Sequence, residues 1–455
     1  MKRRRFIAVV AVVAAFGLPT AMARQEPTIA FTNVNVVPMD SNRVLENQTV
    51  LVSKGRITAL GPAGSTQVPG GATRVDGKGK YLMPGLAEMH GHVPSPLDSR
   101  KTPQESRQYT EDVLFLYVAA GVTTVRGMQG GAGQLELRDE VNRGALVGPS
   151  LYLAGPGFTG NAVKSVEEAT ARVRTQKKEG WDLLKVLPGI SREVYDAMAR
   201  TAKEVDIEFS GHVPAAVGVP HALEMGQRTV DHLDGYAEHL GGETKPVDVK
   251  GIQDLVERTK RAGAWMVPTL VVWETLRGPV TLESRTAMPG LKYLPQDIVG
   301  GWTKAVENRL KSPKYDAGAA KIYIDNRMRI MTALYKGGVR ILLGSDAPQQ
   351  FNVPGFSIYP EMRRMADAGM TTFDILRSGT AAVGEYLEGK QNVGTIAVGQ
   401  RADLILLDAN PLQGLGNVEK RSGVMVQGRW LSQADIDTRL NQIASRAGAS
   451  AQPGN

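Results

Sequence analysis

Residues 83–92 have the sequence MPGLAEMHGH, a short apolar run that ends in two histidines. A run of this kind is typical of a buried β-strand. Because residues i and i+2 of a strand point to the same face, His90 and His92 can approach one ligand together. A His-x-His pair alone is weak evidence, since neighbouring histidines also occur on polar rims. The pair gains weight only if other strands end in similar residues.

The middle of the chain alternates short apolar strands with amphipathic stretches. Helices are expected at 166–179, 192–204, 250–262 and 361–368. Eight candidate strands end near His90, Arg126, Ala154, Val186, Val213, Leu233, Val271 and Asp346. The alternation predicts an α/β protein with parallel strands, and eight units predict a (β/α)8 TIM barrel. An open doubly wound sheet is the competing fold.

The last two candidate strands are separated by a long interval at about 275–335, rich in Gly, Pro and aromatic residues. Long insertions at a barrel mouth are usually functional, so this one is expected to be a lid or a substrate wall.

The two ends of the mature chain have a different character from the middle. Residues 28–83 and 393–431 contain short alternating or β-branched runs cut by glycine-rich turns. This pattern predicts a small β-sandwich domain built from both ends of the chain. The expected organisation is a signal peptide, a two-part β-sandwich domain, a barrel, and a final helix with a tail, at residues 1–23, 24–83 plus 386–434, 84–385 and 435–455.

The composition is ordinary for a globular protein, with 42 % hydrophobic and 22 % charged residues among 455. The chain has no cysteine. A disulfide framework, a zinc ribbon, an iron–sulfur cluster, a thiol nucleophile and a lipidated cysteine are therefore excluded. Any metal must be bound mainly by histidine and carboxylate.

The N-terminus explains half of the formal charge of +8. A basic segment at residues 2–5, an apolar run at 6–18 and an Ala-x-Ala site at 21–23 predict a secretory signal peptide, because the run is too short to span a membrane. The segment at 3–7 is also similar to a twin-arginine signal. Cleavage near Ala23 removes four positive charges, so we expect an exported, periplasmic or secreted protein. No basic run remains in the mature chain, which argues against nucleic-acid binding. No later apolar stretch approaches the length of a membrane span, which argues against a stable membrane anchor.

Three further candidate ligands stand at strand ends: His212, His232 and Asp346. In barrels, functional groups gather at the C-terminal ends of the strands. Each residue alone could be a satisfied polar residue of the core. Four histidines and one aspartate converging on one face are better explained as a metal site.

Lys185 lies in an apolar strand, Leu183–Val186, where an isolated ammonium is costly to bury. One explanation is an ion pair with a carboxylate inside the barrel. The other is a carbamate formed from the neutral amine and CO2, which would turn the side chain into a bridging anionic ligand.

These motifs together resemble the amidohydrolase superfamily, in particular exported members related to imidazolonepropionase-like enzymes and metal-dependent Xaa-Pro dipeptidases. The resemblance covers nearly all of the mature chain. It rests on the Pro-Gly-Leu and His-x-His motif at 84–92, on Lys185, on His212 and His232 twenty residues apart, on Gly-Ser-Asp at 344–346, and on the tail motif at 394–404.

The resemblance implies a binuclear site with two divalent metal ions. One ion would be held by His90, His92 and Asp346, and the other by His212 and His232. Carboxylated Lys185 and a hydroxide would bridge the ions. Zn2+ suits these ligands, while Mn, Co and Fe remain alternatives. Asp346 would be the catalytic residue that moves the proton from the attacking hydroxide to the leaving amine.

The function expected on this basis is hydrolysis of a C–N bond, amide or peptide, in a small-molecule substrate. A lactonase or esterase could use the same site, and a non-catalytic metal-binding protein is a third possibility. Deamination is disfavoured, because that branch commonly has a mononuclear site without the lysine. The chain departs from dipeptidase-like relatives at Val213, where they often have Tyr, and at residues 127–128, where an acidic residue is common. A homo-oligomer is compatible with the sequence.

The remaining two histidines carry less information. His221 falls in a helical stretch and is expected to be structural. His239 and the nearby Tyr236 follow the sixth strand, where either contact with substrate or a place in a surface loop would fit.

Overall fold

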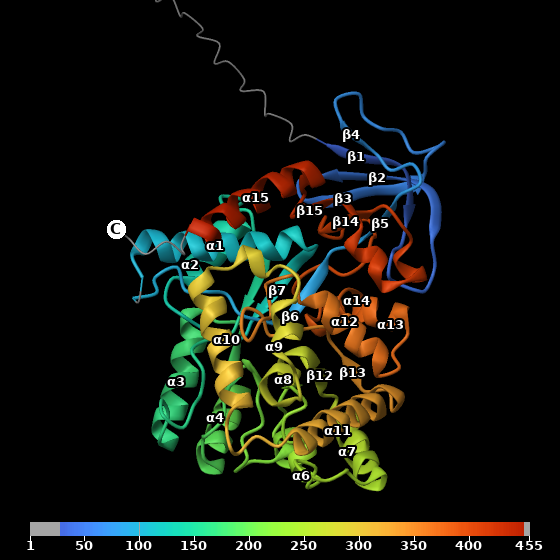
Figure 1. Cartoon of the computed structure of the whole chain (residues 1–455). Coiled ribbons are helices and arrows are strands. Elements are labelled where there is room, and N and C mark those ends of the chain that lie inside the picture. The colour runs from blue at the N-terminus through green and yellow to red at the C-terminus, as the bar shows by residue number, and fades with distance from the viewer. Residues whose placement is uncertain (1–27, 100, 450–455) are drawn as a thin grey trace, which may run out of the picture.

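A computed structural model describes residues 28–99 and 101–449 of the chain (Figure 1). The expected signal peptide at 1–23 lies outside these residues. The protein has an α/β fold in which a parallel-stranded region is joined to a largely antiparallel sheet.

The first sheet combines both ends of the chain. Its N-terminal strands are β1 (Ile29–Val36), β2 (Leu45–Ser53), β3 (Arg56–Pro62), β4 (Thr73–Asp76) and β5 (Tyr81–Pro84). Its C-terminal strands are β14 (Leu404–Leu407), β15 (Arg421–Val426) and β16 (Arg429–Ser432). The order is β16-β15-β14-β5-β1-β2-β3, with β4 paired to β1, and β5 and β14 join the two ends by antiparallel pairing. Phe31, Leu82 and Leu404 are fully buried in its core.

The parallel strands form two sheets, β6-β7-β8 and β9-β10-β11-β12-β13. They are β6 (Leu86–Gly91), β7 (Val122–Gly127), β8 (Ser150–Leu153), β9 (Leu183–Val186), β10 (Glu208–Gly211), β11 (Thr229–Asp231), β12 (Trp265–Val267) and β13 (Arg340–Ile341). A parallel bridge from Ala154 to Leu183 links β8 to β9. On the other side, the amide of Met89 in β6 donates to the carbonyl of Leu343, just beyond β13.

Helices connect these strands and cover them from outside. They are α1 (Pro103–Ala119), α2 (Gln134–Asn142), α3 (Val166–Glu179), α4 (Arg192–Glu204), α5 (Val219–Glu224), α6 (Tyr236–His239), α7 (Val249–Ala262), α12 (Ile358–Asp367), α13 (Thr372–Ser378) and α14 (Ala381–Tyr386). The hydroxyl of Ser165 caps the first turn of α3, and Gly180 ends that helix in the left-handed conformation. The bounds of α3 and α4 match the sequence prediction.

The segment between β12 and β13 is largely helical. It contains α8 (Leu270–Arg277), α9 (Leu282–Thr286), a 3-10 turn η1 (Leu291–Tyr293), α10 (Gln296–Leu310) and α11 (Ala317–Lys336). In α10, Trp302 lies 5.8 Å, ring to ring, from the buried Phe351, which belongs to the loop that follows Asp346. This contact joins the insertion to the loop carrying a candidate ligand.

The prediction that the seventh strand ends near Val271 is wrong. β12 ends at Val267, and Val271 lies in α8. Pro268 has no amide hydrogen to continue the ladder, and Thr269 adopts a left-handed backbone with φ of 43°. The carboxylate of Glu361 then accepts hydrogen bonds from the amides of Leu270 and Val271 at 2.7 and 3.0 Å, which begins the helix.

The C-terminal helix α15 (Gln433–Ala449) packs against the rest of the protein. Ile436, Leu440 and Ile443, which recur at helical spacing, are all buried. At the far end of the helix, Arg446 binds Asp112 of α1 at 2.6 Å. The predicted helix is therefore confirmed, with its apolar face on the protein. Two 3-10 turns, η2 (Pro411–Gln413) and η3 (Leu415–Glu419), complete the C-terminal part.

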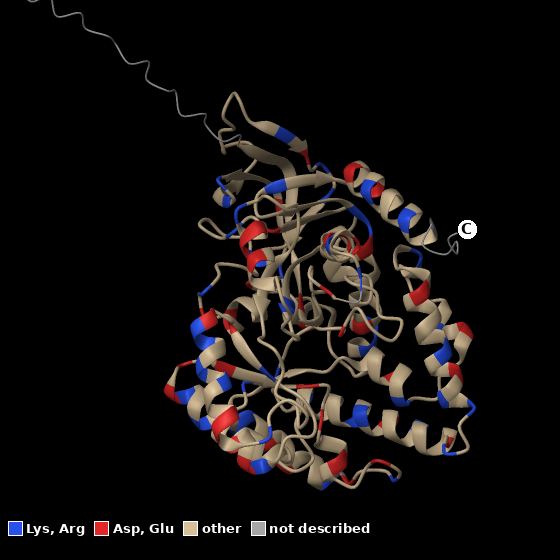
Figure 2. Cartoon of the chain, turned by 90° about the vertical axis from the view of Figure 1, so that its left-hand side faces the viewer, with Lys and Arg blue, Asp and Glu red and all other residues tan. Residues whose placement is uncertain are grey.

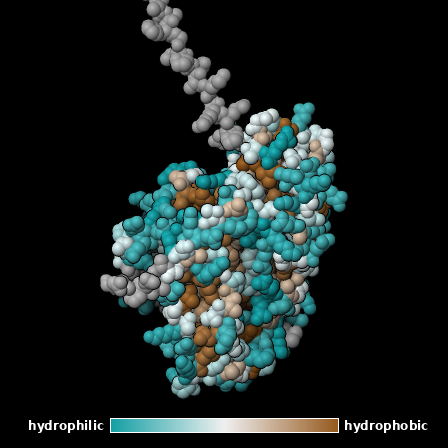
Figure 3. All heavy atoms as spheres, turned by 45° about the horizontal axis from the view of Figure 1, so that its top comes forward, coloured by the Kyte–Doolittle hydropathy of each residue, from teal (hydrophilic) through white to brown (hydrophobic). Residues whose placement is uncertain are grey.

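The surface carries mixed charge and scattered apolar patches. Lys and Arg are interspersed with Asp and Glu along the outer helices (Figure 2). On the face shown in Figure 3, apolar side chains form several patches separated by polar residues. Among the helices of residues 28–99 and 101–449, none has the length and apolar character needed to cross a membrane.

Candidate active site

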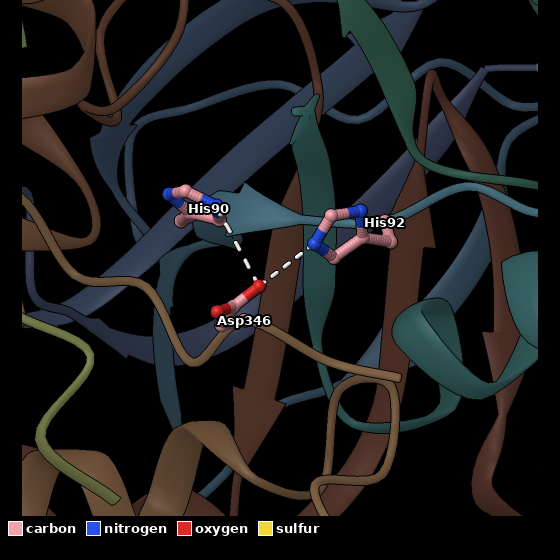
Figure 4. Close-up of side chains that lie close together, drawn as sticks. All are labelled: His90, His92 and Asp346. Carbon is pink, nitrogen blue, oxygen red and sulfur yellow. Dashed lines mark hydrogen bonds and ion pairs between the residues drawn. The ribbon is translucent and has the colours of Figure 1, made fainter. Parts of the chain in front are cut away.

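His90 and His92 come together with Asp346 as the strand pattern predicts (Figure 4). The Oδ1 atom of Asp346 lies 2.8 Å from Nε2 of His92 and 3.5 Å from Nε2 of His90. His90 is fully buried, whereas the side chain of His92 is 28 % exposed. Ligand atoms from all three residues lie within 4.8 Å of one another, a spacing that could hold one metal ion.

The backbone fixes the approach of Asp346. Its amide donates to the carbonyl of His90 at 2.7 Å, and the amide of His92 donates to the carbonyl of Ala347 at 2.7 Å. Asp346 has a φ of 65°, an uncommon conformation for a residue with a side chain. The loop after β13 is therefore held against the end of β6 at the point where the three side chains meet.

Lys185 reaches the same cluster from β9. Its Nζ atom lies 3.1 Å from Nε2 of His90, and the residue is 1 % exposed. Burial lowers the pKa of Lys185 to about 8. Within residues 28–99 and 101–449 no carboxylate lies within ion-pair distance of Lys185, although the charges of Asp231 and Asp346 act on it from farther away.

A glycine on the neighbouring strand makes room for Lys185. Gly211 of β10 has a φ of 122°. A Cβ atom at this position would lie 2.9 Å from Cδ of Lys185 and 2.6 Å from the carbonyl oxygen of Val186. Both distances are shorter than side-chain packing allows, so this site requires glycine.

His212 and His232 complete the cluster. The ring centroid of His232 lies 4.4 Å from that of His212 and 4.3 Å from that of His90. His232 is buried, and burial lowers its pKa, like that of His90, well below the ordinary value. Neutral imidazoles are the form that binds metal ions.

Each of these three histidines has a polar side chain, called here its outer partner, close to Nδ1; for His212 and His232 the two groups form a hydrogen bond, whereas for His90 only the distance is short. The Nδ1 atom of His90 lies 2.7 Å from Oδ2 of Asp231, and Nδ1 of His212 lies 2.5 Å from Oδ2 of Asp234. The Nδ1 atom of His232 lies 2.7 Å from Oγ1 of Thr269. An ionised carboxylate only accepts hydrogen bonds, so a proton on Nδ1 leaves Nε2 with a free lone pair. This is the arrangement that metal-binding histidines adopt, and the donor set therefore fits a divalent metal.

Behind His90 lies a buried ion pair. Arg126 of β7 donates through Nη2 to both carboxylate oxygens of Asp231, at 3.1 Å each, and neither side chain is exposed. Burial opposes the charged form of Asp231, but the Arg126 guanidinium outweighs it and lowers the pKa of this carboxyl. The ion pair therefore keeps a charged carboxylate beside the ring of His90, at 2.7 Å from Nδ1.

The outer partners Asp231 and Asp234 are not among the residues predicted from the sequence. The signal that could have found them is local: an acidic residue directly before His232 and another two positions after it. Arg126 was predicted only as the end of a strand. Like Lys185, it is a charged residue inside a strand that is expected to be buried, and this could have marked it as part of the site.

Glu88 supports the two strands that carry His90 and Asp346. Its carboxyl oxygens accept from the amide of Ser345 at 2.7 Å, from its hydroxyl at 2.5 Å and from the amide of His90 at 3.1 Å. Burial raises the pKa of Glu88 to about 8. The residue fixes the relative position of the strand ends from inside the protein.

The other candidates lie apart from the cluster. His221 in α5 pairs with Asp196 at 2.6 Å and lies 2.7 Å from Arg192, an arrangement that agrees with a structural role. Tyr236 is buried, with its hydroxyl 2.5 Å from that of Thr259. His239 ends α6 and is exposed.

Known proteins resemble the chain over most of its length. The 5-methylthioadenosine/S-adenosylhomocysteine deaminase of Caldanaerobacter subterraneus subsp. tengcongensis is 22 % identical over 422 residues, which cover 83 % of this chain and 84 % of the deaminase. Bottromycin amidohydrolase superimposes with a TM-score of 0.72 at 23 % identity, covering 92 % of this chain and 91 % of the other. A Xaa-Pro dipeptidase with bound methionine gives a TM-score of 0.67 at 20 % identity, covering 89 % and 100 %.

The sequence profile of the amidohydrolase family matches residues 81–431, from β5 to β16. This span contains the whole parallel region, every candidate ligand and the strands that return to the first sheet. The resemblance inferred from the motifs is therefore confirmed, and the chain belongs to the amidohydrolase family, as a hydrolase that acts on carbon–nitrogen bonds.

Proposed function

We propose that this chain is an exported, binuclear metal-dependent amidohydrolase that cleaves an amide or peptide bond of a small substrate. The observation that carries the proposal is the meeting of four imidazoles, Lys185 and Asp346 at the ends of five strands, with the Nδ1 atoms of His212 and His232 hydrogen-bonded to outer partners. Functional groups of parallel α/β proteins gather at this edge.

The proposal includes a closed barrel at residues 84–385. Two hydrogen bonds support closure, because they bridge both gaps between the two parallel sheets: the amide of Gly155 donates to the carbonyl of Leu183, and the amide of Met89 donates to the carbonyl of Leu343. The sheet shared by the chain ends would be a β-sandwich domain of residues 24–83 and 386–434, followed by a helix and tail at 435–455.

His90, His92 and Asp346 would hold one divalent metal ion, and His212 and His232 a second. Lys185, as a carbamate, would bridge them. The contact of its amine with an imidazole, with no carboxylate partner among the described residues, supports this role. Zn2+ suits imidazole and carboxylate ligands. When bound, such ions act as Lewis acids that polarise the scissile carbonyl and acidify water.

The chain's own residues then supply orientation and proton transfer. Asp346 is the carboxylate best placed to take a proton from the attacking water and to return it to the leaving nitrogen, because its Oδ1 lies beside His92, the more exposed member of the group. Protonation of the leaving nitrogen is essential, since an amide anion is a very poor leaving group. His90, Lys185 and His232 are almost fully buried, so solvent meets the cluster at its more exposed members, His92 and His212.

Several relatives support cleavage of a C–N bond in a small molecule. The similar solved structures include a Xaa-Pro dipeptidase, and the similar sequences include deaminases. We favour amide or peptide cleavage over deamination, because Lys185 occupies the cluster. Removal of residues 1–23 during export would leave all of the proposed ligands in place.

The test is a panel of dipeptides, N-acyl amino acids and lactones offered to the metal-loaded protein and to its Asp346→Asn variant. We expect hydrolysis of an amide substrate, a fall of about 10²- to 10⁴-fold in the variant, and little loss of bound metal. Asp196→Asn, which alters an Asp–His pair outside the cluster, is the matched control. Unchanged turnover in the Asp346→Asn variant would contradict the proposed role of this carboxylate in proton transfer.

A further inference from the structure

Arg327 is a buried cation on α11, in the insertion between β12 and β13. Its side chain is almost fully buried, and within residues 28–99 and 101–449 no carboxylate lies within ion-pair distance of it. The charge of Glu361 interacts with Arg327 from farther away. Burying a charge without an ion-pair partner is costly, so the groups that do contact this guanidinium deserve an explanation.

One of these groups belongs to a candidate metal ligand. The Nη2 atom of Arg327 donates a hydrogen bond to the carbonyl oxygen of His232, which lies 95 positions earlier in the chain. Among the described residues, no backbone amide donates to this carbonyl. The guanidinium therefore supplies the hydrogen bond that the buried carbonyl of His232 requires.

The backbone at His232 has an uncommon conformation that needs support. His232 and the following Leu233 have φ values of 64° and 52°, in the left-handed region. Residues with side chains stay in this region only where the surrounding structure fixes them. The amide of His232 donates to the carbonyl of Val267 at 2.8 Å, and its Nδ1 atom lies 2.7 Å from Oγ1 of Thr269. These two contacts come from the end of β12, whereas the contact at the carbonyl comes from α11.

Two aromatic rings hold the guanidinium of Arg327 in place. It lies 4.6 Å from the ring centroid of Trp273 on α8 and 5.5 Å from that of Tyr323 on α11. Its Nη1 atom donates to the hydroxyl of Tyr323 at 3.4 Å. A planar guanidinium stacks well on aromatic faces, which a lysine ammonium cannot do in the same way. The stacking keeps Arg327 against the carbonyl of His232.

We propose that Arg327 is a positioning residue of the candidate active site, through which the insertion holds His232 in the orientation that binds the second metal ion. Arg327 acts through His232 and is not itself a ligand. The inference rests on the proposed function, because it takes His232 as a metal ligand. It gives the insertion a part in metal binding, beyond the lid or substrate wall expected from its length.

A purely structural role for Arg327 makes a different prediction. Loss of general stability would affect both proposed metal ions alike. Loss of positioning would affect mainly the ion bound by His212 and His232, because His90, His92 and Asp346 are held by hydrogen bonds between the end of β6 and the loop after β13. The two ions therefore report separately on the two explanations.

The experiment is a titration of the metal-free protein with Co2+, whose visible absorption depends on the geometry of its ligands. We expect wild type to bind two equivalents. In Arg327→Met, which removes the charge and the donors, one equivalent should bind about 10- to 100-fold more weakly and with a changed absorption, while the other keeps its affinity. Arg327→Lys restores the charge and a donor, so the loss should be smaller.

Arg277→Met is the matched control. Arg277 is an exposed arginine that stacks on the same Tyr323 ring at 4.7 Å and lies 3.6 Å from Glu243. Its substitution leaves the contact between Arg327 and His232 in place, so both equivalents of Co2+ should bind as in wild type.

Kinetics provide a second readout once an amide substrate is known. Arg327→Met should lower kcat and leave KM nearly unchanged, because Arg327 affects the reaction only through His232. A raised KM with an unchanged kcat would contradict the positioning role.

Equal affinities for both equivalents in wild type, Arg327→Met and Arg327→Lys would overturn the proposal. If Arg327→Met does not fold, equal affinities in wild type and Arg327→Lys would do so. Weakening of both equivalents to the same extent would also overturn it, since this is the result of a general loss of structure. A wild-type chain that binds no divalent metal would contradict the proposed function itself, on which the inference depends.

Discussion

The Nδ1 atom of His90 lies 2.7 Å from the Oδ2 atom of Asp231, and both side chains are fully buried. Asp231 is itself fixed by Arg126, which donates to both of its carboxylate oxygens. A buried carboxylate this close to Nδ1 favours a proton on that atom, which would leave the Nε2 atom of His90 free to bind a metal ion.

Asp231→Asn should lower the affinity for divalent metal by about 10- to 100-fold, because the amide is a weaker partner for Nδ1. It should also lower the free energy of unfolding by about 3–5 kcal/mol, since the buried Arg126 loses the carboxylate with which it forms an ion pair. Competition with a chelator measures the affinity for the metal, and urea unfolding measures the free energy of unfolding.

The control is Asp196→Asn, which weakens a similar carboxylate–imidazole pair outside the cluster. Asp234→Asn provides a second variant at the site, because the partner of His212 is 14 % exposed and its loss should not unfold the protein. Equal metal affinity in wild type, Asp231→Asn and Asp234→Asn would show that the outer partners do not orient the ligands.

Gly211→Ala should disturb the position of Lys185. The added Cβ would meet Cδ of Lys185 and the carbonyl of Val186 within 3 Å. Gly226→Ala is the matched control: it has the same type of positive φ, but no atom lies within 4 Å of an added Cβ. We expect Gly211→Ala to be less stable than Gly226→Ala by about 1–3 kcal/mol and to lose metal. Equal unfolding free energies and equal metal contents would contradict the close packing around Lys185.

Glu361, which is not one of the candidate ligands, should make the stability of the protein depend on pH. Burial raises its pKa to about 8 from an ordinary value of 4.5, although two amide donors favour the charged form. The folded chain thus binds this proton more tightly than the unfolded chain. The resulting stability is present in full below about pH 4.5 and is lost as the pH rises through about 8.

Urea unfolding between about pH 5 and pH 8 tests this relation. Wild type should lose stability relative to Glu361→Gln by up to about 1.4 kcal/mol per pH unit, the limit for one proton. Glu307→Gln, an exposed substitution on α10, should follow wild type. Parallel profiles for wild type and Glu361→Gln would show that Glu361 is charged in the folded protein throughout this range.

The sequence predicted those parts of the protein that depend on local patterns. Apolar spacing and the cap at Ser165 determine α3, and the bounds of this helix agree with the prediction. The grouping of His90, His92 and Asp346 followed from two rules, the alternation of strand side chains and the common edge of parallel strands.

The parts that were missed depend on contacts between distant residues. The start of α8 is set by Glu361, which follows Leu270 by 91 positions, so no local pattern could place it. Asp231 and Arg126 are 105 positions apart, and their pairing becomes visible only when β7 and β11 face each other. The candidate ligands stand at strand ends that can be recognised in the sequence. Their outer partners become evident only when the strands pack together in the folded protein.

The central claim, a binuclear metal-dependent hydrolase, is tested most directly by counting metal in the active protein. Elemental analysis of the purified chain should give two equivalents of divalent metal, with activity lost on chelation and regained when Zn2+ is restored. Replacement of His212 by Asn should reduce the count to about one, since the remaining ligands around Asp346 are intact. A fully active preparation that contains no divalent metal would contradict the account.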